Sequence, residues 1–122
     1  KAELEMIVVA TSAQNNCLYC VVSHGAVLRI RAKDPVLSDQ LAINFRKSKI
    51  TKKQMAMLNF AVKVTKESDN ISDKDFEILQ DHGFDIEDAW RIASVASFFA
   101  MSNRLANTFS MLPNTEFYNM GR

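Results

Sequence analysis

Two cysteines separated by two residues are the part of this sequence with the clearest chemical potential. They stand in the run Cys17-Leu18-Tyr19-Cys20, and His24 follows four residues after the second. Residues three and four apart share a face of a helix, so this spacing would bring both thiols and the imidazole together. A helix N-terminus favours a thiolate, and a nearby histidine can accept or supply the proton that thiol chemistry needs. The pattern predicts a redox-active dithiol with a histidine as its proton partner.

The same residue types are also compatible with roles that involve no catalysis. Cys17, Cys20 and His24 could bind zinc with Glu5 or His82 as the fourth ligand, although structural zinc sites usually combine two cysteine pairs. A structural disulfide between residues three apart would remove little chain entropy, and disulfides are rare in cytosolic proteins. Two buried, unreactive thiols are the remaining alternative.

Helices joined by short loops are expected to position these residues. Glycine and proline are scarce, at three and two, and they stand at the expected boundaries. The segment 1–13 carries apolar residues on one helical face, although its run Ile7-Val8-Val9 is also typical of a short strand. If this first helix packs against the cysteine-bearing helix, Glu5 joins the site as a further proton-handling group.

Capping signals delimit the later helices. Asn15 or Asn16 is the expected N-cap of the cysteine-bearing helix, Thr51 and Ser72 fit capping boxes, and Gly83 is a stop signal. The expected helices after the first run from about Cys17 to Arg31, Asp34 to Phe45, Thr51 to Lys66, Ser72 to Gly83 and Asp85 to Phe109.

The last expected helix is unusual because apolar residues fall on nearly every face between Ile86 and Phe109. A surface helix shows a single apolar stripe, so this one is expected to be covered on two or more sides. It is either a central core helix or one that also forms a subunit interface. Asn103, near its end, is expected to have a structural role, and contact with the active-site face is the alternative.

The composition indicates one globular domain over residues 1–122, with 48% hydrophobic and 24% charged residues. A net charge of +1 argues against a nucleic-acid-binding protein that depends on a large positive field. No apolar run reaches the ~18 residues of a membrane span, and the N-terminus is not typical of a signal peptide. We therefore expect a cytoplasmic domain, and the initial Lys1 suggests that an N-terminal portion of a longer protein precedes it.

The pattern E-x11-C-x2-C-x3-H, formed by Glu5, Cys17, Cys20 and His24, resembles a family signature. It is that of the AhpD-like alkylhydroperoxidases, in the peroxidase-related branch of the carboxymuconolactone decarboxylase superfamily. The run ELEMIVVATSAQNNCLYCVVSHGAVLR is similar to the family's core helical pair, and LNFAVKVT and ASFFAMSNRLANTF resemble its downstream helices. The resemblance covers nearly the whole chain. It implies an all-α fold with a helical hairpin core, in homo-oligomers of intertwined subunits.

The resemblance also implies a function, a thiol-dependent peroxidase that reduces alkyl or hydrogen peroxide in antioxidant defence, without metal or haem. Cys20 would attack the peroxide, Cys17 would resolve the product as a disulfide, and His24 with Glu5 would relay protons. A dithiol, such as a lipoyl group on a partner protein, would reopen the disulfide. Neither nucleic acid nor membrane is expected as a partner. Some family members carry a second histidine directly before the second cysteine, where this chain has Tyr19.

Two other functions remain open. The same cysteine pair could serve a thiol-disulfide oxidoreductase or a redox sensor that acts on protein thiols. A zinc-stabilised helical interaction module is the alternative from another class. Bound zinc would distinguish the module from both redox functions, and peroxide turnover would distinguish the peroxidase from protein-thiol exchange.

Overall fold

The computed structural model describes all residues 1–122 and consists of six α-helices with three short 3₁₀ helices and no strand. The α-helices are α1 (Ala2–Gln14), α2 (Leu18–Ala32), α3 (Leu37–Asn44), α4 (Lys52–Glu67), α5 (Asp73–Asp81) and α6 (Ile86–Thr108). The 3₁₀ helices are η1 (Phe45–Lys47), η2 (Ser68–Asn70) and η3 (Thr115–Tyr118). The all-α prediction is confirmed, and the strand alternative for Ile7-Val8-Val9 is wrong because these residues lie in the middle of α1.

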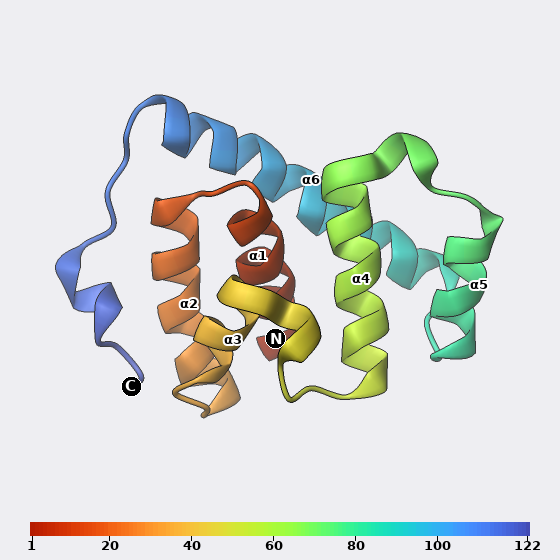
Figure 1. Ribbon diagram of the computed structural model, residues 1–122, viewed down its shortest axis with the longest axis horizontal. Helices are drawn as coiled ribbons and strands as arrows, with labels where there is room; N and C mark the ends of the chain where they lie inside the picture. Colours follow the sequence, from red (N-terminus) through yellow and green to blue (C-terminus); the bar gives the residue numbers. More distant parts are fainter.

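Helix α1 lies at the centre of the bundle and packs against α2, α3, α4 and α6 (Figure 1). Helices α1 and α2 run antiparallel across a short turn, which is the predicted helical hairpin. Helix α5 lies outside α4, and α6 crosses behind α1 and α4. The central position of α1 explains why Val9 and Ala10 are fully buried and belong to a core shared by all six α-helices.

Three helices begin with the capping residues that the sequence indicates. At the start of α4, the hydroxyl of Thr51 accepts the backbone N–H of Gln54 at 3.0 Å, and the Gln54 side chain accepts the N–H of Thr51 at 3.1 Å. Ser72 and Asp85 form the same reciprocal arrangement at the starts of α5 and α6. Helix α5 ends before Gly83, whose φ of 88° favours glycine. Such caps satisfy backbone donors that have no partner within the helix.

The N-cap of α2 differs from the prediction. It is Cys17, in an extended conformation, rather than Asn15 or Asn16. The sulfur of Cys17 accepts the backbone N–H of Cys20 at 3.3 Å and so takes the role that a side-chain oxygen usually has. Asn16 instead makes the turn between the helices, with a left-handed φ of 54° that asparagine tolerates.

Helix α3 begins at Leu37, later than the predicted start at Asp34. The carboxylate of Asp34 accepts the backbone N–H groups of Val36 and Leu37 at 3.0 and 3.2 Å. Asp34 therefore satisfies the first donors of α3 from outside the helix, as an Asx-type turn does. The predicted end near Phe45 is confirmed, since Phe45 is the C-cap of α3 and begins the 3₁₀ turn η1.

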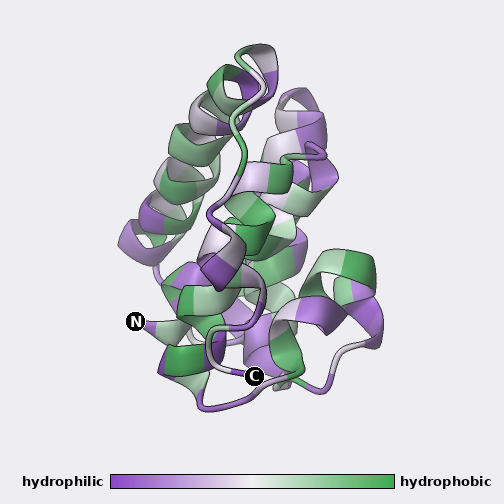
Figure 2. Ribbon diagram, turned by 90° about the vertical axis from the view of Figure 1, so that its left-hand side faces the viewer, coloured by the Kyte–Doolittle hydropathy of each residue, from purple (hydrophilic) through white to green (hydrophobic).

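The C-terminal segment, residues 109–122, returns along α2 (Figures 1 and 2). Arg29 of α2 is 3% exposed and holds this segment by its guanidinium. The Nε and an Nη atom of Arg29 each donate at 2.7 Å, to the carbonyls of Met120 and Phe117, and the other Nη donates to the Ser38 hydroxyl at 3.0 Å. A buried arginine on α2 thus ties the segment that follows α6 to the helix that carries the cysteines.

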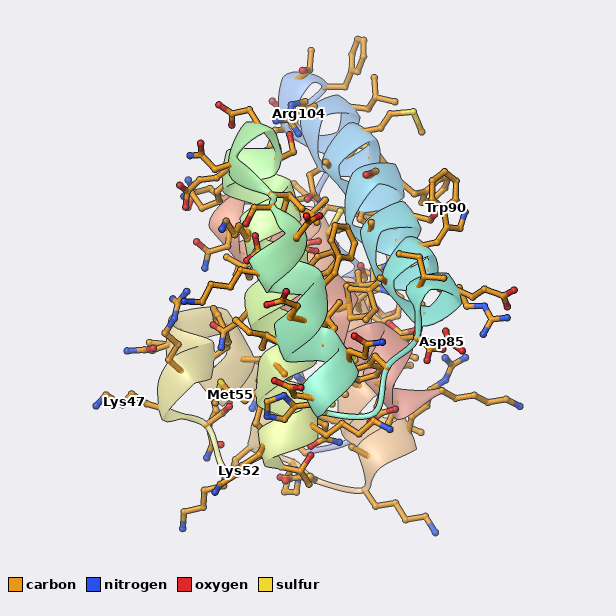
Figure 3. The ribbon with its side chains drawn as sticks, turned by 90° about the vertical axis from the view of Figure 1, so that its right-hand side faces the viewer. Lys47, Lys52, Met55, Asp85, Trp90 and Arg104 are labelled. Atoms are coloured by element: carbon orange, nitrogen blue, oxygen red, sulfur yellow. The ribbon has the colours of Figure 1, made fainter.

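Helix α6 carries apolar residues on two faces, but the chain covers only one of them, whereas the sequence predicts cover on two or more sides; α1, not α6, is the central helix. Its buried residues are Ala89, Ile92, Ala96, Asn103 and Ala106. Its exposed large apolar residues are Ile86, Trp90, Phe98, Met101 and Leu105. Figure 3 shows the Trp90 side chain on the side of α6 that faces away from α4 and α5. One face of α6 therefore belongs to the core, and the other is exposed. No helix of the chain has the length and apolar character that crossing a membrane needs.

Candidate active site

The turn between α1 and α2 brings the two cysteines into one enclosed site. Both are free thiols, with Cys17 1% and Cys20 2% exposed. They form a small apolar cluster with Ala106 of α6, against which the half-buried Tyr19 packs. The predicted dithiol therefore lies within one turn at the start of α2, and the end of α6 covers it.

The predicted partners Glu5 and His24 meet across the helical hairpin. The Nδ1 atom of His24 lies 2.8 Å from one carboxylate oxygen of Glu5, and an Nη atom of Arg31 lies 3.2 Å from the other. The Glu5 side chain is 7% exposed and that of His24 is 30% exposed. A buried carboxylate is stable as an anion only when such partners compensate its charge. Glu5 therefore faces a permanent cation and a titratable one.

Two contacts orient the His24 ring. The Glu5 carboxylate at Nδ1 favours the tautomer that carries its proton there, which leaves Nε2 to exchange protons. Phe99 of α6 packs edge to face against the ring, with centroids 5.0 Å apart and an interplanar angle of 81°. Since His24 lies four residues after Cys20 on α2, its ring shares a helix face with the Cys20 thiol.

Asn103 of α6 is a fourth polar group of the site. It is fully buried, and its Nδ2 atom donates to the Ser12 hydroxyl at 2.9 Å, while its Oδ1 atom accepts the Asn15 amide at 3.1 Å. Asn107, one turn further along α6, donates to the Asn15 carbonyl at 3.0 Å. The structure thus bears out the alternative that Asn103 contacts the site, because its face of α6 packs on the turn that precedes Cys17.

The environment of Cys20 favours the neutral thiol. The pKa of Cys20 is raised from 9.0 to about 12, mainly by burial and further by the hydrogen bond and charge of Cys17, whereas the Asn103 side chain lowers it. The nucleophile in thiol chemistry is the thiolate. Any reaction at Cys20 therefore depends on groups that remove its proton or stabilise the anion.

Crystal structures of two proteins resemble this chain over its full length. The first, described as alkylhydroperoxidase AhpD core and an uncharacterized peroxidase-related protein from Ralstonia eutropha JMP134, is 58% identical with a TM-score of 0.99. The second, an uncharacterized peroxidase-related protein from Silicibacter sp. TM1040, is 43% identical with a TM-score of 0.98. This chain is AhpD-like. Each match covers all of this AhpD-like chain, and this chain spans 64% of the length of each of those two proteins. No protein-family model and no curated protein matches it.

Three side chains of the AhpD-like site were not expected from the motif. Arg31, Ser12 and Phe99 contact Glu5, Asn103 and His24 respectively. Helical spacing could have indicated two of them, because Ser12 follows Glu5 by seven residues and Arg31 follows His24 by seven. Residues seven apart lie on one helix face, so each helix presents a polar pair to the other.

The zinc alternative finds no support in the arrangement of donor groups. No three His, Cys, Asp or Glu side chains are placed so that they could hold a metal ion. His82, a suggested fourth ligand, has its Nδ1 atom 2.8 Å from the carbonyl of Ile78 at the end of α5. This contact at the C-terminal end of α5 agrees with a capping role, since a histidine there satisfies a late carbonyl.

Proposed function

We propose that this chain acts as a thiol-dependent peroxidase that reduces alkyl or hydrogen peroxide through a Cys17–Cys20 dithiol and disulfide cycle. The observation that carries the proposal is the Glu5–His24 pair, 2.8 Å apart, on the helix face of the two thiols. The descriptions of the two similar proteins, alkylhydroperoxidase AhpD core and peroxidase-related, support the same reaction class.

The first step consumes the peroxide at Cys20. The Nε2 atom of His24 takes the thiol proton, and the Cys20 thiolate attacks the nearer peroxide oxygen. The O–O bond breaks, so that sulfur is oxidised to a sulfenic acid and an alkoxide leaves. His24 returns the proton to the alkoxide, which departs as an alcohol, or as water when the substrate is hydrogen peroxide.

The second step closes the disulfide and the third reopens it. The Cys17 thiol condenses with the Cys20 sulfenic acid, forms the S–S bond and releases water. A dithiol reductant then attacks the disulfide, leaves as its own cyclic disulfide and returns both cysteines to thiols. The sum is peroxide plus dithiol giving alcohol, water and disulfide. A lipoyl group on a carrier protein is a dithiol of the required kind.

Glu5 and Arg31 have supporting roles in this proposal. The Glu5 carboxylate stabilises the imidazolium that forms when His24 takes the proton, because it contacts the opposite ring nitrogen. Arg31, at 3.2 Å from Glu5, keeps that carboxylate charged when His24 is neutral. The proton therefore moves within a site whose charges are balanced in both states.

The burial of both thiols favours a small oxidant over a protein thiol as the partner of Cys20. Cys17 is 1% and Cys20 is 2% exposed, so a folded protein surface has almost no access to either sulfur. Protein-thiol exchange requires direct sulfur-to-sulfur attack. In the peroxidase cycle, a small peroxide reaches Cys20, and the dithiol that reopens the disulfide enters as a small molecule or as a group on a flexible arm rather than as a folded surface.

We also propose that a second copy of this chain covers the open apolar face of α6. The exposed residues on this face include Trp90, 75% exposed, and Phe98, 58% exposed. Contiguous exposed apolar surface of this kind marks an interaction site in soluble proteins, and most closed assemblies of one chain are symmetric. The same face adjoins the site, because Phe98 packs against Phe99 and Phe99 against His24.

The test is hydroperoxide consumption by the purified, metal-free chain with dihydrolipoamide as the donor. Cys17→Ser and Cys20→Ser should each abolish catalytic turnover. Cys17→Ser should still trap a sulfenic acid at Cys20, which a dimedone adduct would identify by mass spectrometry. Cys20→Ser should form none. Ser23→Ala is the matched control, since its hydroxyl contacts only the Tyr19 carbonyl, at 2.6 Å.

Absence of turnover in the unchanged chain, with a disulfide that still forms and reopens under mild thiols, would overturn the peroxidase proposal. Protein-thiol exchange would then be the better account. A sulfenic acid that formed at Cys17 instead would reverse the assignment of the two cysteines.

A further inference from the structure

The side-chain amide of Asn103 can make more hydrogen bonds than its two structural contacts require. A side-chain amide offers two N–H donors at nitrogen and two acceptor positions at oxygen. One N–H of Asn103 goes to the Ser12 hydroxyl at 2.9 Å, and its oxygen accepts the Asn15 amide at 3.1 Å. One N–H of the amide is left over. Because Asn103 is fully buried, that donor needs a partner inside the site.

The site offers the Cys20 sulfur as this partner. Ala106, one turn beyond Asn103 on the same face of α6, packs directly on the two cysteines. The Asn103 side chain is also the one influence on this thiol that lowers its pKa, against burial and the effects of Cys17. Ser12 and Asn15, which hold the amide, lie at the end of α1 and in the turn that leads to Cys17.

We propose that Asn103 stabilises the thiolate form of Cys20, by donating its free amide N–H to the sulfur while Ser12 and Asn15 hold the amide in place. This inference rests on the proposed function, in which the Cys20 thiolate attacks the peroxide. The role is distinct from that of His24, which takes the proton. Asn103 is instead a neutral hydrogen-bond donor to the negative sulfur that remains, and it transfers no proton.

The substitutions that test this are Asn103→Asp and Asn103→Leu. In Asn103→Asp, one carboxylate oxygen can still accept from Asn15 and the other from the Ser12 hydroxyl, so the contacts that hold α6 persist. At an assay pH where this carboxylate is ionised, the donor to Cys20 is lost and a negative charge takes its place. Asn103→Leu keeps a similar volume without a donor or a charge.

The measurement is the alkylation rate of Cys20 at fixed pH in a Cys17→Ser background, where it is the only thiol. A hydrogen bond to a charged acceptor is worth at least about a factor of ten in the thiolate fraction. We expect Asn103→Leu to react about 10-fold more slowly than the background, and Asn103→Asp more slowly still. The matched controls Asn107→Leu and Asn107→Asp, one turn away, should stay within about twofold because Asn107 contacts only the Asn15 carbonyl at this junction.

Two reagents of different size, iodoacetamide and N-ethylmaleimide, separate thiolate formation from access to the buried sulfur. A lower thiolate fraction slows both by the same factor, whereas altered packing slows them unequally. In each Asn103 variant, slowing of both reagents by the same factor supports the proposal. Unchanged rates, or unequal factors for the two reagents, would overturn it. Since no peroxide is involved, this result is independent of whether the chain turns over peroxide.

Discussion

The carboxylate of Glu5 lies 2.8 Å from Nδ1 of His24, although the two residues are 19 positions apart in the chain. The antiparallel packing of α1 and α2 creates this contact, and it directs the other ring nitrogen away from the carboxylate. The pair is therefore built by the hairpin and not by either helix alone.

Glu5→Gln should lower peroxide turnover by about 10²-fold, which is the scale of a general acid–base contribution. The amide keeps the shape of the carboxylate but removes the charge that stabilises a protonated His24. Because the two residues act as a unit, the double variant Glu5→Gln with His24→Asn should lose no more than His24→Asn alone. Steady-state rates for the three variants measure this coupling.

Glu3→Gln is the control for the Glu5 substitution. Glu3 lies on the same helix but is exposed, and its only side-chain contact is with Gln54 at 3.4 Å. It should leave turnover unchanged. Additive losses in the double variant would show that Glu5 and His24 act independently.

Stability at alkaline pH should depend on Cys20. Its pKa of about 12 in the folded chain lies above the ordinary value of 9.0, so the folded state keeps a proton that the unfolded chain loses. The stabilisation is fully present below pH 9 and is lost as the pH rises toward 12. The free energy of unfolding of the reduced protein should therefore fall faster than that of Cys20→Ser above pH 9, by at most about 1.4 kcal/mol per pH unit. Urea titrations at several pH values measure the difference, and parallel pH profiles would contradict it.

Arg29→Met should release the C-terminal segment from α2. It removes the donors to the carbonyls of Met120 and Phe117 and leaves these partly buried acceptors without their partner. We expect a loss of about 3 kcal/mol in the free energy of unfolding, with faster proteolysis within residues 113–122. Urea unfolding and limited proteolysis measure the two effects.

Arg104→Met is the matched control for Arg29, because this exposed arginine donates only to the Ala100 carbonyl of its own helix. Its effect should stay below about 0.5 kcal/mol. Gly121→Ala should reproduce part of the Arg29 phenotype, since φ is 74° and an added Cβ would lie 2.9 Å from the Arg29 Cβ. An intact C-terminal segment in Arg29→Met would show that other contacts hold it.

Charges on the open face of α6 should disrupt self-association. Trp90→Glu and Met101→Lys place charge where the proposed second copy would bury apolar surface, 75% and 54% exposed in the single chain. Light scattering should show a shift from an oligomer to the monomer. Ile43→Lys on α3 is the control, because Ile43 is 87% exposed on another helix. A monomer in the unchanged chain would overturn the assembly proposal.

The capping signals of the later helices can be recognised in the sequence because each acts within a few residues. The Thr51–Gln54 and Ser72–Asp75 caps act within four residues, and Gly83 ends α5 by its own conformation. The spacing of Cys17, Cys20 and His24 also determined their common face, since a helix repeats every ~3.6 residues. Those inferences needed no knowledge of how the helices pack.

The surroundings of the cysteines depend on how the helices pack against one another. The sulfur of Cys17 replaced the predicted asparagine as the N-cap, because Asn16 is used for the left-handed turn that reverses the chain. Asn103 and Arg31 joined the site through contacts between helices; the spacing of Arg31 from His24 indicates a shared helix face but not the carboxylate that Arg31 contacts. The physical reason is that capping and periodicity act over a few residues, whereas the crossing of α6 over the hairpin depends on the packing of the whole core.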